Sequence, residues 1–179
     1  KQKSNKMACN TELEEILKGC DNNVGGLKKV YILPEEFLSS ITVVAGEVTA
    51  MTLTSTNKFK SFEFNKGGAS YTEPSAISLE NGSTYFTQTL TMTIPKRELA
   101  KRQALALLTS GQRNLKVIVQ DMNGNYWYMG YENSANVTEL GEGSGVAKAD
   151  GSKYSLTLIA EEPEQMLSVD SSIIAALVA

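Results

Sequence analysis

The residue types that most often carry catalysis are scarce in this chain. Histidine, the usual general base at neutral pH and a frequent metal ligand, is absent from all 179 residues. A Ser-His-Asp triad, a Cys-His dyad and a His-ligated zinc site are therefore excluded. The two cysteines, Cys9 and Cys20, are too few to build a four-cysteine zinc site or a multi-bridge secreted scaffold within one chain. We expect reduced thiols in a protein made in a cytoplasm.

The best match to a metal site is the turn Asp121-Met-Asn-Gly-Asn125. Its spacing fits the first ligand positions of a calcium loop, and Glu132 stands where such a loop carries its bidentate glutamate. The sixth position requires glycine but holds Tyr126, and an apolar segment follows. We therefore interpret this segment as a hairpin turn and expect no bound metal.

Two further groups carry only weak signals of chemistry. The segment 141–148 is rich in glycine but lacks the Gly-Lys-Ser/Thr of a phosphate-binding loop, so we interpret it as a flexible connector. The acid pairs at 35–36 and 161–162 are adjacent in sequence, and adjacent residues rarely face each other across a cleft as a glycosidase pair must. We interpret these acids as solvated charges, and we expect neither a cofactor nor enzymatic activity.

Basic and aromatic groups offer binding functions as alternatives to structural ones. A basic helix face is formed by Lys96, Arg97, Lys101 and Arg102. We interpret it as an ordinary exposed face, with a phosphate backbone or an acidic partner as alternatives. The aromatic groups are Phe59, Phe62, Phe64, Tyr126, Trp127 and Tyr128. Large aromatics in strands usually form core or cross-strand pairs, so base stacking is the less favoured interpretation.

Composition is that of an ordinary globular protein. The chain is 41% hydrophobic and 21% charged, and its length suits one domain with a sizeable core. The formal net charge of −3 removes the usual electrostatic basis for gripping nucleic acid. A weakly acidic surface suits a protein that lies near DNA without binding it tightly. No segment approaches the roughly 20 apolar residues of a membrane span, and we interpret the apolar C-terminus from Ile173 as a docked strand or helix end.

Periodicity predicts several strands and one confident helix. The strands are expected at 27–33, 41–44, 47–54, 58–65, 84–94, 115–120, 126–131 and 154–160. The helix is expected at about 95–109, begun by Pro95 and stopped by Gly111. This order predicts a mainly β protein, an antiparallel β-sandwich or barrel with a single packed α-helix.

The expected organisation is one domain with two arms. Residues 1–20 form an N-terminal arm, 21–165 a single β-barrel-like domain with an insertion loop at about 58–82, and 166–179 a C-terminal arm. Within the first arm, 11–17 either forms a short helix or stays an ordered arm. Residues 1–6 precede Met7, and we expect them to be an expression remnant or an upstream extension.

The layout over about Cys20–Glu164 resembles that of tail tube proteins of long-tailed bacteriophages. The resemblance rests on the arm, the strands, the insertion, one helix, the Gly124-Asn-Tyr-Trp127 hairpin and the closing segment 145–158. It implies a virion protein assembled in the bacterial cytoplasm, whose hexameric rings stack into a tube that genomic DNA crosses without sequence-specific binding. Threonine-rich strands such as 84–94 would turn a polar face to the lumen and an apolar face to the helix.

The same resemblance implies contacts with neighbouring copies and with other tail or neck proteins, and none with a membrane. The insertion and the two arms would make these contacts, through Phe62, Phe64, Tyr71, Ile173, Ile174 and Leu177. A head-tail connector or tail terminator ring protein, which often shares such a subunit, stays open as an alternative. So does a monomeric β-sandwich binding module, which would need the aromatics of 126–131 to be exposed.

Overall fold

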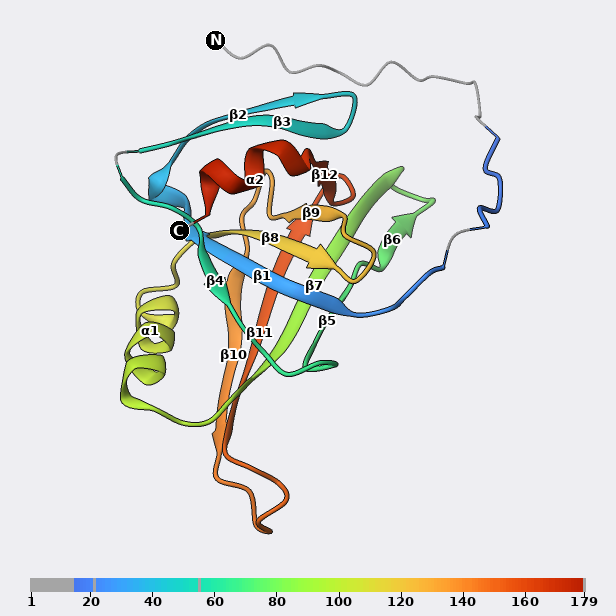
Figure 1. Cartoon of the computed structure of the whole chain (residues 1–179). Coiled ribbons are helices and arrows are strands. Elements are labelled where there is room, and N and C mark those ends of the chain that lie inside the picture. Colours follow the sequence, from blue (N-terminus) through green and yellow to red (C-terminus); the bar gives the residue numbers. More distant parts are fainter. Residues whose placement is uncertain (1–14, 21, 55, 179) are drawn as a thin grey trace.

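The computed structural model describes residues 15–20, 22–54 and 56–178. Two β-sheets face each other, with one helix at an open end of the space between them and a second helix on the outside of the larger sheet (Figure 1). The predicted mainly β sandwich with a packed helix is confirmed.

The larger sheet has seven strands. In spatial order they are β2 (Leu38–Val44), β3 (Glu47–Leu53), β12 (Leu167–Val169), β9 (Tyr126–Met129), β8 (Leu115–Asp121), β1 (Leu27–Pro34) and β4 (Lys60–Phe62). All neighbours are antiparallel except β12, which runs parallel to β3.

The smaller sheet is antiparallel and is built around the long strand β7. Its strands are β10 (Asn136–Gly143), β11 (Lys153–Glu162), β7 (Ser83–Pro95) and β5 (Ala69–Thr72), with β6 (Ser75–Ser78) paired to the first residues of β7. The helices are the 3-10 turn η1 (Glu35–Phe37), α1 (Leu99–Thr109) and α2 (Ser171–Leu177).

The main core fills the space between the two sheets. Period-two alternation turns one set of side chains of each strand inward, and two residues of α1 close the end of the layer. Its principal members are Val30, Ile32, Leu90, Met92, Ile94, Leu105, Leu108, Val117, Val119, Leu156 and Leu158.

A second core lies on the other face of the larger sheet. There α2 and the β2–β3 hairpin cover side chains that alternate with those of the main core. Its principal members are Tyr31, Leu33, Val48, Phe59, Ile118, Tyr128, Val169, Ile174 and Leu177. The larger sheet is thus buried on both faces, which explains the nearly continuous apolar sequence of β8.

The helix begins later than predicted. The chain remains paired with β11 up to Pro95, and the backbone N–H of Lys96 then donates to the carbonyl of Ser152 at 2.8 Å. Lys96 has a positive φ of 62°, and Glu98 is the extended residue that precedes α1. Tertiary pairing therefore prevents Pro95 from starting the helix, whereas the predicted end near Gly111 agrees with the structure.

The two segments predicted to extend from the domain are largely built into it. Residues 166–178 supply β12 and α2, and 58–82 supplies β4, β5 and β6. Of 11–17, the described residues Glu15–Leu17 are not helical, and 11–14 lie outside the described residues together with 1–6, Met7 and Cys9. Within the part of the chain that the structure describes, no helix is long and apolar enough to span a bilayer.

Candidate assembly surface

The outward face of the smaller sheet is lined with hydroxyl groups. Because the even-numbered residues Gln88 to Ile94 point into the core, the intervening threonines of β7 point away from it. Strands β5 and β11 add serines and threonines in register with them. We call this surface the hydroxyl face: Ser70, Thr72, Thr87, Thr89, Thr91, Thr93, Ser155 and Thr157. All eight are exposed or half-buried.

The chemistry of the hydroxyl face is polar but uncharged. Ser70 and Thr91 lie directly opposite each other, and their hydroxyl oxygens are 3.1 Å apart. The same outward surface also carries the half-buried Ile159, in register with Thr89. Three exposed charged residues lie on it as well: Glu161 in register with Thr87, Lys153 with Pro95 and Glu139 with Thr157. Such a surface is well hydrated and lacks the cluster of cations that would hold phosphate groups.

Both sheets end in edge strands whose backbone groups are free to pair with another strand. In the described residues, β2 pairs only with β3, and β10 pairs only with β11. An edge strand presents N–H and C=O groups that can pair with a strand of another chain. The described residues therefore offer two such edges on each sheet, β2 and β4 on the larger one and β10 and β5 on the smaller one.

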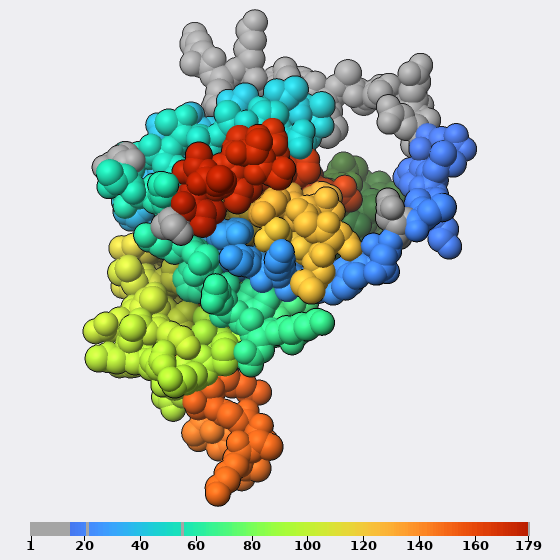
Figure 2. Space-filling view, viewed as in Figure 1, coloured from blue at the N-terminus to red at the C-terminus, as the bar shows by residue number. Residues whose placement is uncertain are grey.

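The β10–β11 hairpin projects beyond the rest of the molecule (Figures 1 and 2). Its tip, 144–152, is held together by Asp150, whose Oδ2 accepts hydrogen bonds from the backbone N–H groups of Val146 at 2.9 Å and Ala147 at 2.8 Å. These bonds lower the pKa of Asp150. Val146 is fully exposed at the tip. The glycine-rich segment 141–148, interpreted from sequence as a flexible connector, begins within a strand, because β10 extends to Gly143.

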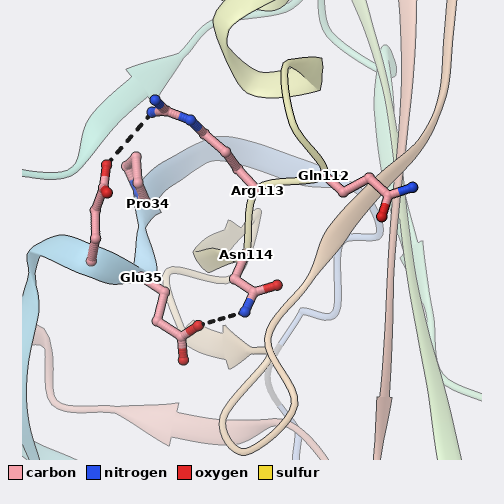
Figure 3. Close-up of a pocket in the computed structure, with 6 residues that line it drawn as sticks. Pro34, Glu35, Gln112, Arg113 and Asn114 are labelled. Atoms are coloured by element: carbon pink, nitrogen blue, oxygen red, sulfur yellow. Dashed lines mark hydrogen bonds and ion pairs between the residues drawn. The ribbon is translucent and has the colours of Figure 1, made fainter.

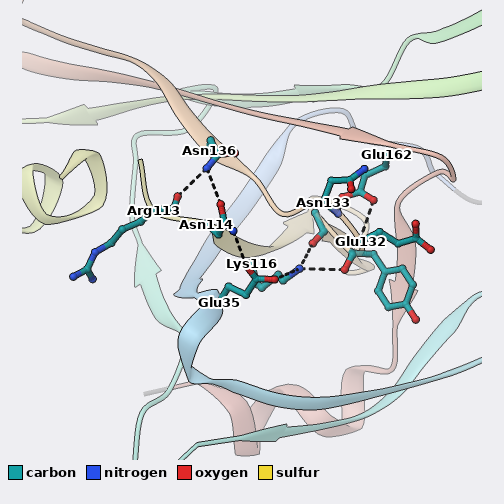
Figure 4. A network of polar contacts seen from close by, with 10 residues as sticks. Glu35, Arg113, Asn114, Lys116, Glu132, Asn133, Asn136 and Glu162 are labelled. Carbon is teal, nitrogen blue, oxygen red and sulfur yellow. Dashed lines mark hydrogen bonds and ion pairs between the residues drawn. The ribbon is translucent and has the colours of Figure 1, made fainter. Parts of the chain in front are cut away.

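A buried lysine, Lys116, lies on β8 in the larger sheet (Figure 4). The side chain of Lys116 is 3% exposed, and its Nζ donates to the carbonyls of Gly130 at 2.8 Å and Tyr131 at 3.1 Å. Glu35 Oε1 lies 3.3 Å from the same Nζ. Burial alone would raise the pKa of Glu35, but hydrogen bonds from Asn114 and the charge of Lys116 contribute to a net lowering.

Two more side chains hold the segment after β9 against the smaller sheet. Glu162, only 2% exposed, accepts from the backbone N–H groups of Glu132 at 3.0 Å and Asn133 at 2.9 Å. Gln88 Oε1 accepts from Gly130 N–H at 3.0 Å. A side chain at Gly130 would collide with the backbone N of Ala135, at 2.7 Å from an added Cβ. These contacts fix the two sheets relative to each other.

The prediction that Glu162 is a solvated charge is wrong, whereas Glu161 is exposed as expected. The alternation of β11 continues to its last residue and turns Glu162 inward, where two backbone donors satisfy its oxygens. Burial raises the pKa of Glu162 above its usual value.

A polar pocket of about 400 Å³ lies where β1 ends and the α1–β8 connection passes (Figure 3). Glu36 pairs with Arg113 at 3.6 Å, and Asn114 Nδ2 donates to Glu35 Oε2 at 2.8 Å. The acids are thus bound by neighbouring side chains of the same chain. The pocket offers no nucleophile activated by a base, so it does not form a catalytic constellation.

The turn proposed from sequence at Asp121–Asn125 connects β8 and β9 as a hairpin, as predicted. Asp121 Oδ1 accepts from Asn125 N–H at 2.8 Å, and Oδ2 accepts from Trp127 Nε1 at 3.2 Å. Burial opposes ionisation, yet these bonds lower the pKa of Asp121 overall. The described residues contain no group of three Cys, Asp or Glu side chains placed to hold a metal ion.

The aromatic residues lie in the cores, as predicted. Phe59 and Tyr128 are fully buried, while Tyr126 and Trp127 are half-buried. In the described structure, Tyr128 Oη has no hydrogen-bond partner, and burial raises the pKa of Tyr128 strongly. Its ring makes an edge contact with Tyr131, with centroids 6.4 Å apart. These rings are therefore not free stacking platforms.

The residues proposed for subunit contacts are divided between the two cores. Phe62, Phe64 and Tyr71 are half-buried against the main core, and the three residues of the C-terminal segment, 173, 174 and 177, pack in the second core. Ile174 and Leu177 are buried within the chain. The structure therefore does not bring this set together on one surface.

The basic residues near α1 are exposed or half-buried and are partly paired with acids. Glu98 lies 2.7 Å from Lys96 Nζ and 3.5 Å from Lys101 Nζ, while Arg97 Nη2 lies 2.8 Å from Glu142. Exposed pairs of this kind contribute little stability.

The buried polar residues Gln88, Lys116 and Glu162 were not identified from the sequence. One signal in the sequence could have revealed Lys116, because it interrupts the apolar sequence of β8. A charged residue in a central strand buried on both faces is rare unless it is paired.

No protein-family model matches the chain, and a search of curated proteins finds no matching relative.

Proposed function

We propose that this protein is a structural subunit of a bacteriophage tail, which forms hexameric rings that stack into a tube for DNA passage. The observation that carries the proposal is the hydroxyl face: eight hydroxyl side chains on an outward sheet surface whose charged residues are two glutamates and one lysine, next to open sheet edges. A surface of this kind can line a hydrated channel without retaining a polyanion.

The rest of the chain supports an assembly role over a catalytic one. The polar side chains that are buried, such as Lys116 and Glu162, are occupied by backbone partners and stabilise the sandwich. The edge strands β2 and β10 provide groups through which copies could pair, and the projecting β10–β11 tip provides reach between stacked rings. In this account the protein resides in the virion tail.

A head-tail connector or tail terminator ring is the second candidate, because a hydroxyl-lined channel suits a single ring as well as a stack. A monomeric binding module is less well supported. It would need exposed aromatics on β9, but Tyr128 is buried and Trp127 is half-buried with its Nε1 bonded to Asp121.

The proposal is tested by light scattering of the purified full chain over a concentration series. We expect the mass to rise from the 19.4 kDa of one chain to that of a hexamer and then to larger species. A mass that stops at one ring favours the connector or terminator candidate. A mass of one chain at every concentration contradicts both ring proposals.

A further inference from the structure

The dipeptide Asn-Gly occurs twice in this chain, at Asn81-Gly82 and at Asn123-Gly124. In this dipeptide the backbone nitrogen of the glycine can attack the side-chain amide of the asparagine, because glycine has no side chain to hinder the approach. Each pair lies in a hairpin turn, the first between β6 and β7 and the second between β8 and β9 (Figure 1). The two sites therefore share one chemistry, and the fold decides how readily each reacts.

Exposure and backbone conformation are similar at the two sites. Asn81 and Asn123 are both exposed. Both glycines have a positive φ, 62° at Gly82 and 96° at Gly124, as is usual in turns. The sites differ instead in the hydrogen bonds that hold the reacting groups.

Hydrogen bonds engage the reacting groups of the β8–β9 turn. Asn123 Oδ1 accepts from the backbone N–H of Val24 at 2.9 Å, and Asn123 Nδ2 donates to Asn23 Oδ1 at 3.0 Å. The backbone N–H of Gly124 donates to the carbonyl of Asp121 at 3.3 Å. The attacking nitrogen and the side-chain amide are thus both held, and the reaction requires that these bonds break first.

The β6–β7 turn leaves the same groups unheld. Within the described part of the chain, neither the side-chain amide of Asn81 nor the backbone N–H of Gly82 has a hydrogen-bond partner. The backbone N–H of Asn81 donates to Ser78 Oγ at 3.4 Å, but this bond holds neither reacting group. The turn 79–82 contributes no residue to either core, so it can reach the geometry of attack without loss of packing.

We propose that Asn81 is a site of spontaneous deamidation and that the fold protects Asn123 from the same reaction. The nitrogen of Gly82 forms a bond to Cγ of Asn81 while its proton passes to solvent, and the bond from Cγ to Nδ2 breaks to release ammonia. Water then opens the resulting cyclic imide at either of its carbonyls. In sum, one amide and one water become one carboxylate and one ammonium ion.

The reaction changes both the charge and the length of the turn. It places a new carboxylate beside Glu80. Where the imide opens at the backbone carbonyl, the main chain between β6 and β7 also gains one methylene group. This inference concerns the single chain and does not depend on ring assembly, so its failure would leave the proposed function untouched.

Incubation of the purified full chain at mildly alkaline pH tests the proposal, with peptide mass spectrometry to follow each site. Trypsin releases residues 67–96 as one peptide, in which Asn81 is the only asparagine. We expect this peptide to gain about 1 Da, at a rate about tenfold or more above that at Asn123. A rate at Asn81 that does not exceed that at Asn123 would overturn the proposal, as would the absence of any gain.

The unfolded chain separates the effect of the fold from that of neighbouring residues. In guanidinium chloride the bonds that hold Asn123 and Gly124 are lost, so the two rates should agree within about threefold. In the folded chain, Asn23→Ala removes the partner of Asn123 Nδ2 and should raise the rate at Asn123 while leaving that at Asn81 unchanged. A rate ratio that persists in guanidinium chloride would overturn the protection assigned to these bonds.

Discussion

At the residue scale, Lys116 is a buried charge on β8 that holds the segment after β9 within the larger sheet. Its ammonium group satisfies two backbone carbonyls that follow β9 and lies beside Glu35. A charged hydrogen bond of this type contributes about 1.5–3 kcal/mol, and its removal leaves buried acceptors without a donor. Among the lysines that the structure describes, Lys116 alone is buried.

We therefore expect Lys116→Met to lower the free energy of unfolding by about 2–3 kcal/mol, measured by urea denaturation of the single chain. The matched control is Lys148→Met at the exposed hairpin tip, where a change within about 0.5 kcal/mol is expected. Equal losses from the two substitutions would contradict the structural role of Lys116.

Glu162 should make stability depend on pH in the direction opposite to an ordinary paired carboxylate. Burial raises its folded-state pKa above the usual value of 4.5, so the folded protein binds a proton more readily than the unfolded chain does. Its favourable contribution is complete below the unfolded pKa and is lost as the pH rises through the folded pKa.

We expect the wild-type free energy of unfolding to fall more steeply between about pH 4.5 and pH 7 than that of Glu162→Gln, which cannot ionise there. The exposed neighbour provides the control, because Glu161→Gln should keep the wild-type pH dependence. Parallel curves for the wild type and Glu162→Gln would be inconsistent with this account.

At the element scale, the tip of the β10–β11 hairpin can be changed without removing a residue from either core. Gly143 pairs directly with Lys153, and the tip between them contributes no residue to either core. Replacing 144–152 with Asn-Gly should close the hairpin by a two-residue turn and change the free energy of unfolding by less than about 1 kcal/mol.

The same replacement should stop rings from stacking, because the reach of the tip is lost. Electron microscopy is expected to show single rings in place of tubes, while Lys148→Ser, which keeps the tip, should assemble normally. Tubes of ordinary length from the shortened protein would contradict a role for the tip in stacking.

The sequence predicts those elements whose side chains alternate, such as β7 and β11, and those that form a short, largely apolar run, such as β1 and β8. It does not predict β10, because the segment from Asn136 carries glycines and glutamates that disfavour strands, and pairing with β11 holds it in place. It also does not predict β12, since three residues give no period, and its position between β3 and β9 is a tertiary feature. The threonine alternation of β7 was readable from sequence, whereas its register with Ser70 and Ser155 was not.

At the scale of the whole molecule, the proposed function requires the hydroxyl face to line the lumen of an assembly. Substituting the opposed pair Ser70 and Thr91 by lysine should therefore place cations in the channel and cause assembled rings to retain DNA, with an affinity that falls as salt rises. The matched control substitutes the opposed, exposed pair Ser40 and Thr52 by lysine on the other sheet. Equal DNA retention by both variants, in a filter-binding assay, would argue against a luminal hydroxyl face.

The most direct test of the proposed ring assembly is negative-stain electron microscopy of the purified full chain over a concentration series. We expect six-fold rings with an open centre and, at higher concentration, hollow tubes whose diameter is that of the rings. Isolated single-chain particles at every concentration would contradict the proposal.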